Sequence, residues 1–197
     1  MKLYYAPAAC SLADHIALHE AGFEFDRTRV NLKTHTTEDG DDYTALNPKG
    51  YVPALELDSG ELLTENIAIL DWITQQNPAL GPSGAMGRTH LLEKLAFIST
   101  EIHKGFKPFF AGASEEEKAR ASVQLGERFA QIAEMMQGDY LFGSELSVAD
   151  AYLFVMLTWA DKNGVPVPDK LTALRERMLQ RDAVRMALRH EGLLEAA

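Results

Sequence analysis

The stretch NPKGYVPALELDSGELLT, residues 47–64, places a proline directly before one strand and joins that strand to a second. Residues 52–57 and 61–64 have strand composition, and the Asp-Ser-Gly turn between them is typical of a β-hairpin. Proline has no N–H to give to a sheet ladder, so the peptide bond before Pro53 is a candidate for the cis form. An ordinary loop proline is the alternative interpretation.

The segments around this hairpin alternate between strand and helix. Upstream, residues 2–5 suit a strand, residues 11–21 an amphipathic helix and residues 25–32 a second strand, which a polar loop follows. Downstream, apolar residues recur at helical spacing over residues 67–74. The order βαβ followed by ββα predicts a thioredoxin-like α/β domain.

The second half of the chain has a different pattern. Proline and glycine concentrate in residues 77–87, and strand signals are scarce beyond them. Apolar residues recur at helical spacing over residues 91–109, and Ser114 and Ser147 begin capping boxes of two further helices. Two shorter helices are expected to begin at Asp169 and Asp182. We therefore expect a thioredoxin-like domain over residues 1–77, a linker over residues 78–87 and an all-helical domain over residues 88–197.

Composition limits the classes of protein to consider. The chain has 197 residues, a formal net charge of -10 and one cysteine. An acidic balance without a Lys/Arg-rich cluster argues against nucleic acid or an anionic membrane as a partner. A single cysteine excludes an internal disulfide and a multi-cysteine zinc site. No apolar run approaches the ~20 residues of a membrane span, and the first residues lack a signal-peptide pattern, so we expect a cytoplasmic protein.

The single cysteine, Cys10, lies where the first strand gives way to the first predicted helix. Ser11 and Asp14 have the spacing of a capping box for that helix. Near a helix N-terminus the unpaired N–H groups and the helix dipole favour negative charge, so one interpretation is a thiolate with a lowered pKa. The other interpretation is a small, buried hydrophobic residue.

Two further motifs are typical of a peptide-binding site. If the Val52-Pro53 bond is cis, the backbone groups of Val52 turn outward and can pair antiparallel with an extended peptide. In LLTENIAI, residues 62–69, Glu65 suits an ammonium group, while Asn66 and open backbone donors suit a carboxylate. Together they could hold the amino-acid end of a ligand. A simple helix cap is the alternative for this motif.

These motifs resemble those of bacterial cytosolic glutathione S-transferases, most closely the beta class, along essentially the whole chain. The matching stretches are MKLYY, ACSLADHI, LNPKGYVPAL, LLTENIAI, EIHKGFKPFF and SVADAYLF. Cys10 followed by Ser11, with His103 and Lys104 in the helical domain, is the beta-class combination. The resemblance implies the glutathione S-transferase fold, glutathione as co-substrate in the cleft between the domains, and a homodimer with a role in detoxification.

The resemblance also implies roles for particular residues. The predicted catalytic residues lie around the glutathione sulfur: Cys10, Tyr5, Ser11 and His103. The residues predicted to bind glutathione are Cys10, Val52, Pro53, Glu65, Asn66, His103, Lys104 and His35. Val52 is assigned to the cysteinyl backbone of glutathione, and Glu65 with Asn66 to its γ-glutamyl end. Lys33 is an alternative to His35 for the glycyl carboxylate. A solvated helix edge is the alternative for His103 and Lys104.

The function implied is conjugation of the glutathione thiol to small apolar electrophiles. Hydrogen bonds and positive potential, with His103 and Lys104 contributing, would hold the glutathione sulfur as a thiolate. Candidate walls of the electrophile pocket, with core packing as the alternative, are Phe106, Phe109, Phe110 and Trp159. Two other functions stay open: a glutathione-dependent thiol-disulfide oxidoreductase in which Cys10 attacks a disulfide, and a non-catalytic binding relative.

One pair of histidines raises the question of a metal. His15 and His19 have the i, i+4 spacing at which two helical residues can bind one ion. No third ligand is evident in the sequence, and the charge pattern suits a solvated helix face. We therefore expect no metal site.

Overall fold

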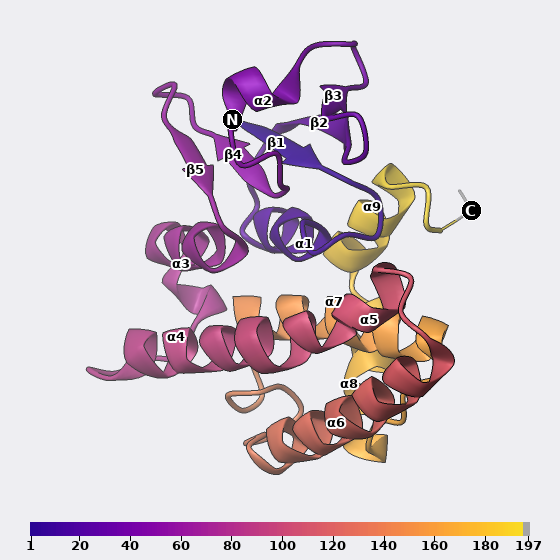
Figure 1. Cartoon of the computed structure of the whole chain (residues 1–197). Coiled ribbons are helices and arrows are strands. Elements are labelled where there is room, and N and C mark those ends of the chain that lie inside the picture. Colours follow the sequence, from indigo (N-terminus) through magenta and orange to yellow (C-terminus); the bar gives the residue numbers. More distant parts are fainter. Residues whose placement is uncertain (195–197) are drawn as a thin grey trace. The chain divides into compact units, whose positions relative to one another are not determined.

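The computed structural model describes residues 1–194 and divides them into two compact units, which we describe separately (Figure 1). The first unit comprises Met1–Asn77 and the segment that begins at Arg181, and the second comprises Pro78–Gln180. The expected helical domain over residues 88–197 differs from this division at its C-terminal end. The last helix of the chain packs with the first unit instead.

The first unit is built on a mixed sheet with the strand order β3-β2-β1-β4-β5. Its strands are β1 (Lys2–Tyr5), β2 (Asp26–Asn31), β3 (Thr36–Thr37), β4 (Ala54–Glu56) and β5 (Leu62–Thr64). Strand β1 pairs parallel with β2 and antiparallel with β4, and β4 pairs antiparallel with β5. The predicted thioredoxin-like order and the hairpin are confirmed. The predicted polar loop contains β3 and a short helix, α2 (Tyr43–Leu46).

Helices cover both faces of this sheet. Helices α1 (Leu12–Glu20) and α3 (Asn66–Gln76) lie on one face and α2 lies on the other (Figure 1). Successive side chains of a strand point to opposite faces of the sheet, so Tyr4 and Tyr5 of β1 pack on different faces. Tyr4 packs 5.6 Å from the ring of Tyr43 in α2, whereas Tyr5 packs 5.7 Å from the ring of His15 in α1.

The last helix, α9 (Asp182–His190), lies beside α1 within the first unit (Figure 1). The Arg181 guanidinium donates to the Glu20 carboxylate over 2.8 Å at one end of the helix pair. At the other end, Glu191 Oε1 lies 3.0 Å from His15 Nδ1. These two contacts between α1 and the residues that flank α9 explain why the segment beginning at Arg181 belongs to the first unit.

The second unit is helical, as the sequence predicts. It begins with a 3-10 turn, Pro78–Leu80, and its helices are α4 (Gly87–Phe97), α5 (Lys107–Phe110), α6 (Glu115–Glu134), α7 (Val148–Asn163) and α8 (Asp169–Leu179). Helix α7 is buried along most of its length. The predicted starts of α8 at Asp169 and of α9 at Asp182 are confirmed. Within residues 1–194, no helix has the length and apolar character needed to span a membrane.

The long helix predicted over residues 91–109 is interrupted. A π-helical segment, Ile98–His103, follows α4, and a 3-10 segment, Lys104–Phe106, leads into α5. Single π-helical turns of this kind occur frequently at functional sites. His103 and Lys104 lie at the junction of the two segments.

Candidate functional site

Three motifs of the first unit meet around Cys10. The Cys10 thiol donates to the carbonyl oxygen of Val52 over 3.5 Å. The Asn66 side-chain amide donates to the carbonyl oxygen of Cys10 over 2.8 Å. The structure therefore brings the cysteine loop, the proline loop and the start of α3 together, with Cys10 itself partly exposed.

Ser11 has a structural role in the cysteine loop. Its hydroxyl is fully buried, accepts from the Ala6 N–H over 3.3 Å and lies 3.4 Å from the Ala6 carbonyl oxygen. The capping box predicted for Ser11 and Asp14 is wrong, because this hydroxyl closes the preceding loop rather than capping α1. Burial also keeps the hydroxyl away from any ligand, so the structure does not support the predicted catalytic role of Ser11.

Asn66 faces the protein interior. Its amide nitrogen, besides holding Cys10, donates to Asp14 Oδ2 over 3.0 Å. Asp14 is fully buried, and burial raises the pKa of its carboxyl well above the usual value. The predicted contact between the Asn66 side chain and a ligand carboxylate is thus not favoured, because its amide hydrogens are already used. The donors that remain are the backbone N–H groups of the first turn of α3, which have no partner within a helix.

We expect Asn66→Ala to lower the free energy of unfolding by about 2–4 kcal/mol, because it removes two hydrogen bonds that tie α3 to the cysteine loop and α1. Urea denaturation measures this loss. Gln75→Ala is the matched control: Gln75 is an exposed amide residue of the same helix that bonds only to Asp71 one turn away. Equal stability of the two variants would show that the buried amide does not hold these elements together.

The electrostatic state of Cys10 differs from the sequence prediction. Burial raises the pKa of the Cys10 thiol to about 12, and the Asp14 carboxyl adds to the rise. The backbone N–H groups of Cys10 and Ser11 and the Asn66 amide act in the opposite direction but more weakly. The lowered pKa predicted from the helix N-terminus is therefore wrong, and Cys10 is a neutral thiol at physiological pH.

The proline loop presents a backbone donor. The Val52-Pro53 peptide bond is cis, one of the two forms that the sequence leaves open. The Tyr43 hydroxyl and the Asn47 amide both donate to the Tyr51 carbonyl oxygen, over 2.8 Å and 2.9 Å. These two hydrogen bonds fix the backbone directly before Val52. In the part of the chain that the structure describes, the N–H of Val52 has no hydrogen-bond partner. A peptide backbone could accept from it.

Glu65 stands at the start of α3 with its carboxylate at the surface. Its backbone has φ 73°, a left-handed conformation that is uncommon outside glycine. Lys49 Nζ donates to Glu65 Oε1 over 2.6 Å and to Thr64 Oγ1 over 3.1 Å. The sequence carries no signal for Lys49 apart from its place in the proline motif. A ligand ammonium group would share the carboxylate with this lysine.

The two candidates for a glycyl carboxylate lie in different places. His35 lies against the proline loop, since a Cβ on Gly50 would come within 2.8 Å of the His35 ring. His35 Nδ1 is buried and has no hydrogen-bond partner within residues 1–194. Lys33 is exposed and lines a hollow beside Ala6 and Pro7. The position of His35 next to the proline loop favours it over Lys33.

Tyr5 is not joined to Cys10. Its side chain is buried against the His15 ring on the α1 face of the sheet. Across residues 1–194, no hydrogen bond or ring contact connects Tyr5 with Cys10. The predicted position of Tyr5 beside the thiol therefore has no contact to support it.

His103 belongs to a polar and aromatic cluster of the second unit. Its Nδ1 atom lies 2.7 Å from the Tyr152 hydroxyl, and its ring lies 5.0 Å from the Trp159 ring. Burial and the nearby Lys104 ammonium lower the pKa of His103, so the ring is neutral at pH 7. The positive charge expected from His103 is therefore not supported, and the exposed Lys104 is the cation that remains of this pair.

The aromatic candidates divide between core and surface. Phe106 is fully buried, which assigns it to the core rather than to a pocket wall. Phe110 is 59% exposed, and its ring meets that of Trp159 edge-on at 4.9 Å. Trp159 contacts His103 but is buried, so of this pair Phe110 is the ring that offers apolar surface near the histidine.

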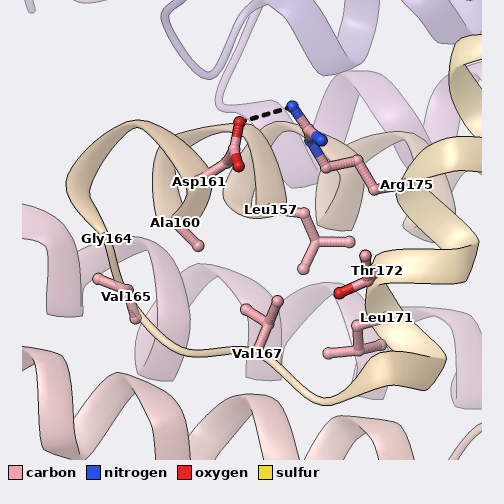
Figure 2. A pocket seen from close by; sticks show the side chains of 9 residues that line it. All are labelled: Leu157, Ala160, Asp161, Gly164, Val165, Val167, Leu171, Thr172 and Arg175. Atoms are coloured by element: carbon pink, nitrogen blue, oxygen red, sulfur yellow. Dashed lines mark hydrogen bonds and ion pairs between the residues drawn. The ribbon is translucent and has the colours of Figure 1, made fainter.

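A separate hollow of the second unit contains none of the predicted site residues. Figure 2 shows its largely aliphatic lining: Leu157, Ala160, Asp161, Gly164, Val165, Val167, Leu171, Thr172 and Arg175. Arg175 donates to Asp161 over 2.8 Å at its edge. It lies between the end of α7 and the start of α8.

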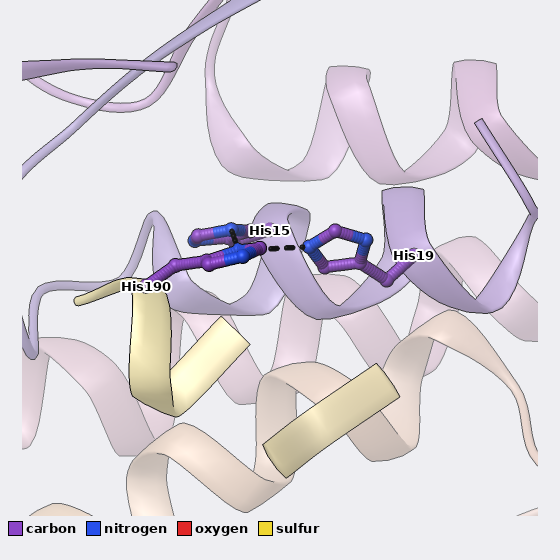
Figure 3. A group of neighbouring side chains, drawn as sticks. All are labelled: His15, His19 and His190. Carbon is purple, nitrogen blue, oxygen red and sulfur yellow. Dashed lines mark hydrogen bonds between the residues drawn. The ribbon is translucent and has the colours of Figure 1, made fainter. Parts of the chain in front are cut away.

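The expectation that no third ligand accompanies His15 and His19 is wrong. His190, the last residue of α9, lies beside both (Figure 3). Burial lowers the pKa of His15 to about 3 and of His19 to about 4, so both rings are neutral at pH 7.

Comparison with known proteins identifies the family. Models of the glutathione S-transferase N-terminal and C-terminal domains match residues 9–76 and 97–182. Glutathione S-transferase GstA of Escherichia coli O157:H7 is 42% identical, over 98% of this chain and 100% of the relative. The chain belongs to the glutathione S-transferase family.

Solved structures of family members are similar to this one throughout. A sphingomonad glutathione S-transferase complexed with glutathione is 46% identical with a TM-score of 0.91, and the match covers 98% of this chain and 100% of that chain. A bacterial beta-class glutathione S-transferase of Sphingomonas chungbukensis is 45% identical with a TM-score of 0.90 and the same coverage. The expected resemblance to the beta class and the expected fold are confirmed.

Proposed function

We propose that this member of the glutathione S-transferase family conjugates the glutathione thiol to small apolar electrophiles. One observation carries the proposal: a neutral Cys10 thiol lies 3.5 Å from the carbonyl oxygen of Val52, whose N–H has no hydrogen-bond partner among the described residues. These groups offer a donor for a sulfur and a backbone edge for a peptide. The sphingomonad relative, whose structure contains glutathione, supports the same ligand here.

The neutral state of Cys10 favours a transferase over an oxidoreductase. A hydrogen bond to the charged form of a group stabilises that form, so the Cys10 S–H would stabilise a glutathione thiolate placed beside it. A monothiol oxidoreductase needs the opposite state, because the thiolate of its own cysteine attacks the disulfide. Burial of the Cys10 thiol disfavours that thiolate. The glutathione sulfur is then the nucleophile.

The remaining groups of the first unit would hold the rest of the tripeptide. The N–H and carbonyl oxygen of Val52 would pair with the cysteinyl backbone, as in strand addition. The backbone N–H groups at the start of α3 would bind the γ-glutamyl carboxylate, and Glu65 the ammonium group. His35 would bind the glycyl carboxylate, with its unpartnered Nδ1 as the supporting observation.

The second unit would contribute charge and apolar surface. Lys104 would supply positive potential for the thiolate, and a neutral His103 would offer a hydrogen bond through Nε2 while Nδ1 bonds to Tyr152. Phe110, which packs against the buried Trp159, would contact the electrophile through its exposed apolar ring. We further propose that the protein acts in the cytoplasm as a homodimer with a role in detoxification, which membership of this family supports.

We expect Glu65→Gln to raise the dissociation constant for glutathione about tenfold or more, since a charge-assisted hydrogen bond to the ammonium group contributes about 1.5–3 kcal/mol. Isothermal titration calorimetry with reduced glutathione measures the change. Glu61→Gln, which neutralises an exposed carboxylate of the neighbouring hairpin, is the control and should bind like the wild type. If both variants bind normally, Glu65 does not contact the ligand.

Parallel assays of conjugation and disulfide reduction test the function itself. We expect glutathione conjugation to chlorodinitrobenzene to be the larger activity of the wild type. Cys10→Ser keeps a hydrogen-bond donor beside the sulfur and should retain more conjugation than Cys10→Ala, which keeps none. Disulfide reduction without conjugation, lost in Cys10→Ser, would support the oxidoreductase alternative, and failure to bind glutathione would support a non-catalytic relative.

A further inference from the structure

Three imidazoles of the first unit converge on one point between α1 and α9 (Figure 3). His15 and His19 lie one turn apart on α1, and His190 is the last residue of α9. His190 Nδ1 lies 3.3 Å from His19 Nε2 and 3.4 Å from His15 Nε2. One ligand atom from each of the three residues lies within 4.8 Å of the other two.

These separations match those of a metal site. Zinc binds imidazole nitrogen at about 2.0–2.1 Å in tetrahedral geometry, which places any two ligand nitrogens about 3.3–3.4 Å apart. Two of the three nitrogen pairs already have this spacing. The third pair joins His15 to His19, and it needs to close by rotation of the partly exposed His19 side chain.

A buried carboxyl group orients the innermost ring. Glu191 Oε1 lies 3.0 Å from His15 Nδ1, and both side chains are fully buried. Glu191 Oε2 also accepts from the Ala8 N–H over 2.9 Å, which fixes the carboxyl group. Histidines that bind metal commonly donate their second ring nitrogen to a carboxylate in this way. The contact leaves His15 Nε2 pointing at the other two rings.

An ion pair and an aromatic ring border the cluster, and two of its histidines are partly exposed. The Arg181–Glu20 ion pair fixes the opposite ends of α1 and α9. The Phe25 ring packs 4.9 Å from the His19 ring and excludes water on that side. Arg27 is the charged group near the cluster that opposes a cation. His190 is partly exposed and so leaves an entry path from solvent.

We propose that His15 Nε2, His19 Nε2 and His190 Nδ1 bind one zinc ion, with water as the fourth ligand. Imidazole ligands suit zinc, copper and nickel, and the tetrahedral spacing of the nitrogens favours zinc among them. The site uses none of the residues assigned to glutathione, so it stands independently of the proposed function.

A zinc titration of the untagged protein in competition with a chromophoric chelator tests the site. We expect one zinc ion per chain, and an affinity at least about tenfold weaker in His19→Gln and in His190→Gln because each loses one of three ligands. Cobalt should give the visible absorption bands of a tetrahedral ion in the wild type but not in these variants. His90→Gln, an exposed histidine of α4, and Cys10→Ala are controls that should leave the zinc affinity unchanged.

Circular dichroism and glutathione binding separate loss of the site from loss of the fold. We expect His19→Gln and His190→Gln to keep the wild-type spectrum and affinity for glutathione, because neither residue lies in the glutathione site. Glu191→Gln should weaken zinc binding without changing its stoichiometry. Unchanged zinc affinity in His190→Gln, or no stoichiometric binding by the wild type, would overturn the proposal and leave three imidazoles that only hydrogen-bond to one another.

Discussion

Cys10 is expected to react with iodoacetamide at pH 8 at least about a hundredfold more slowly than free cysteine. A thiol with a pKa near 8.5 is about one quarter thiolate at this pH, whereas a thiol with a pKa near 12 is about one part in ten thousand. Burial and the Asp14 carboxyl raise the Cys10 pKa to about 12. Because only the thiolate attacks the reagent, the rate follows this fraction. The chain has one cysteine, so the mass of the intact protein reports Cys10 alone.

The pH dependence separates a raised pKa from restricted access. If the pKa of Cys10 lies near 12, the thiolate fraction and the alkylation rate rise about tenfold per pH unit through pH 10. A buried thiol with an ordinary pKa would instead reach a plateau above pH 9. Asp14→Asn keeps an acceptor for the Asn66 amide and removes the charge, so it should react faster than the wild type. The urea-unfolded protein should react like free cysteine. A rate near that of free cysteine in the folded protein would restore the thiolate interpretation.

The sequence predicts the fold best where two signals coincide. The hairpin has strand composition on both sides of an Asp-Ser-Gly turn, and α8 and α9 begin at the aspartates that the pattern indicates. Strand β3 and helix α2 lie within the predicted polar loop because two and four residues are too few to show a period. The π-helical and 3-10 segments have no sequence signal, since their apolar spacing is close to that of an α-helix.

The sequence also predicts which parts of the site meet, but not their state. Cys10, Val52 and Asn66 come together as the motifs indicate. The sign of the Cys10 pKa shift is wrong because burial outweighs the helix N-terminus, and burial depends on packing that no local pattern contains. The direction of the Asn66 amide has the same origin, since Asp14 becomes its partner only when α1 packs against α3.

His190 shows the limit of local reasoning most clearly. It stands 171 residues from His19 and 175 residues from His15 in the chain. Its place beside them follows from α9 returning to the first unit, where Arg181 binds Glu20. The i, i+4 pattern of α1 alone identifies two of the three imidazoles and predicts a solvated face.

Replacing Asp150 by alanine is expected to lower the free energy of unfolding by about 3–5 kcal/mol, because three buried donors lose their acceptor and each unsatisfied group costs about 1–3 kcal/mol. Asp150 is fully buried at the start of α7. Its Oδ1 accepts from the Leu141 N–H over 2.8 Å. Its Oδ2 accepts from the Ser147 N–H and hydroxyl, over 2.8 Å and 2.6 Å. The carboxyl therefore fixes both the central helix and the loop before it.

Urea denaturation at pH 8 measures this effect, since burial raises the pKa of Asp150 only to about 6 and the carboxyl is ionised at pH 8. Asp161→Ala is the matched control on the same helix: its carboxylate is exposed and pairs with Arg175, so its loss should cost less than about 1 kcal/mol. If Asp150→Ala does not fold, Asp150→Asn keeps one acceptor and should give an intermediate loss. Equal stability of Asp150→Ala and Asp161→Ala would mean that solvent replaces the buried carboxylate, and that apolar packing of α7 alone determines the stability of the second unit.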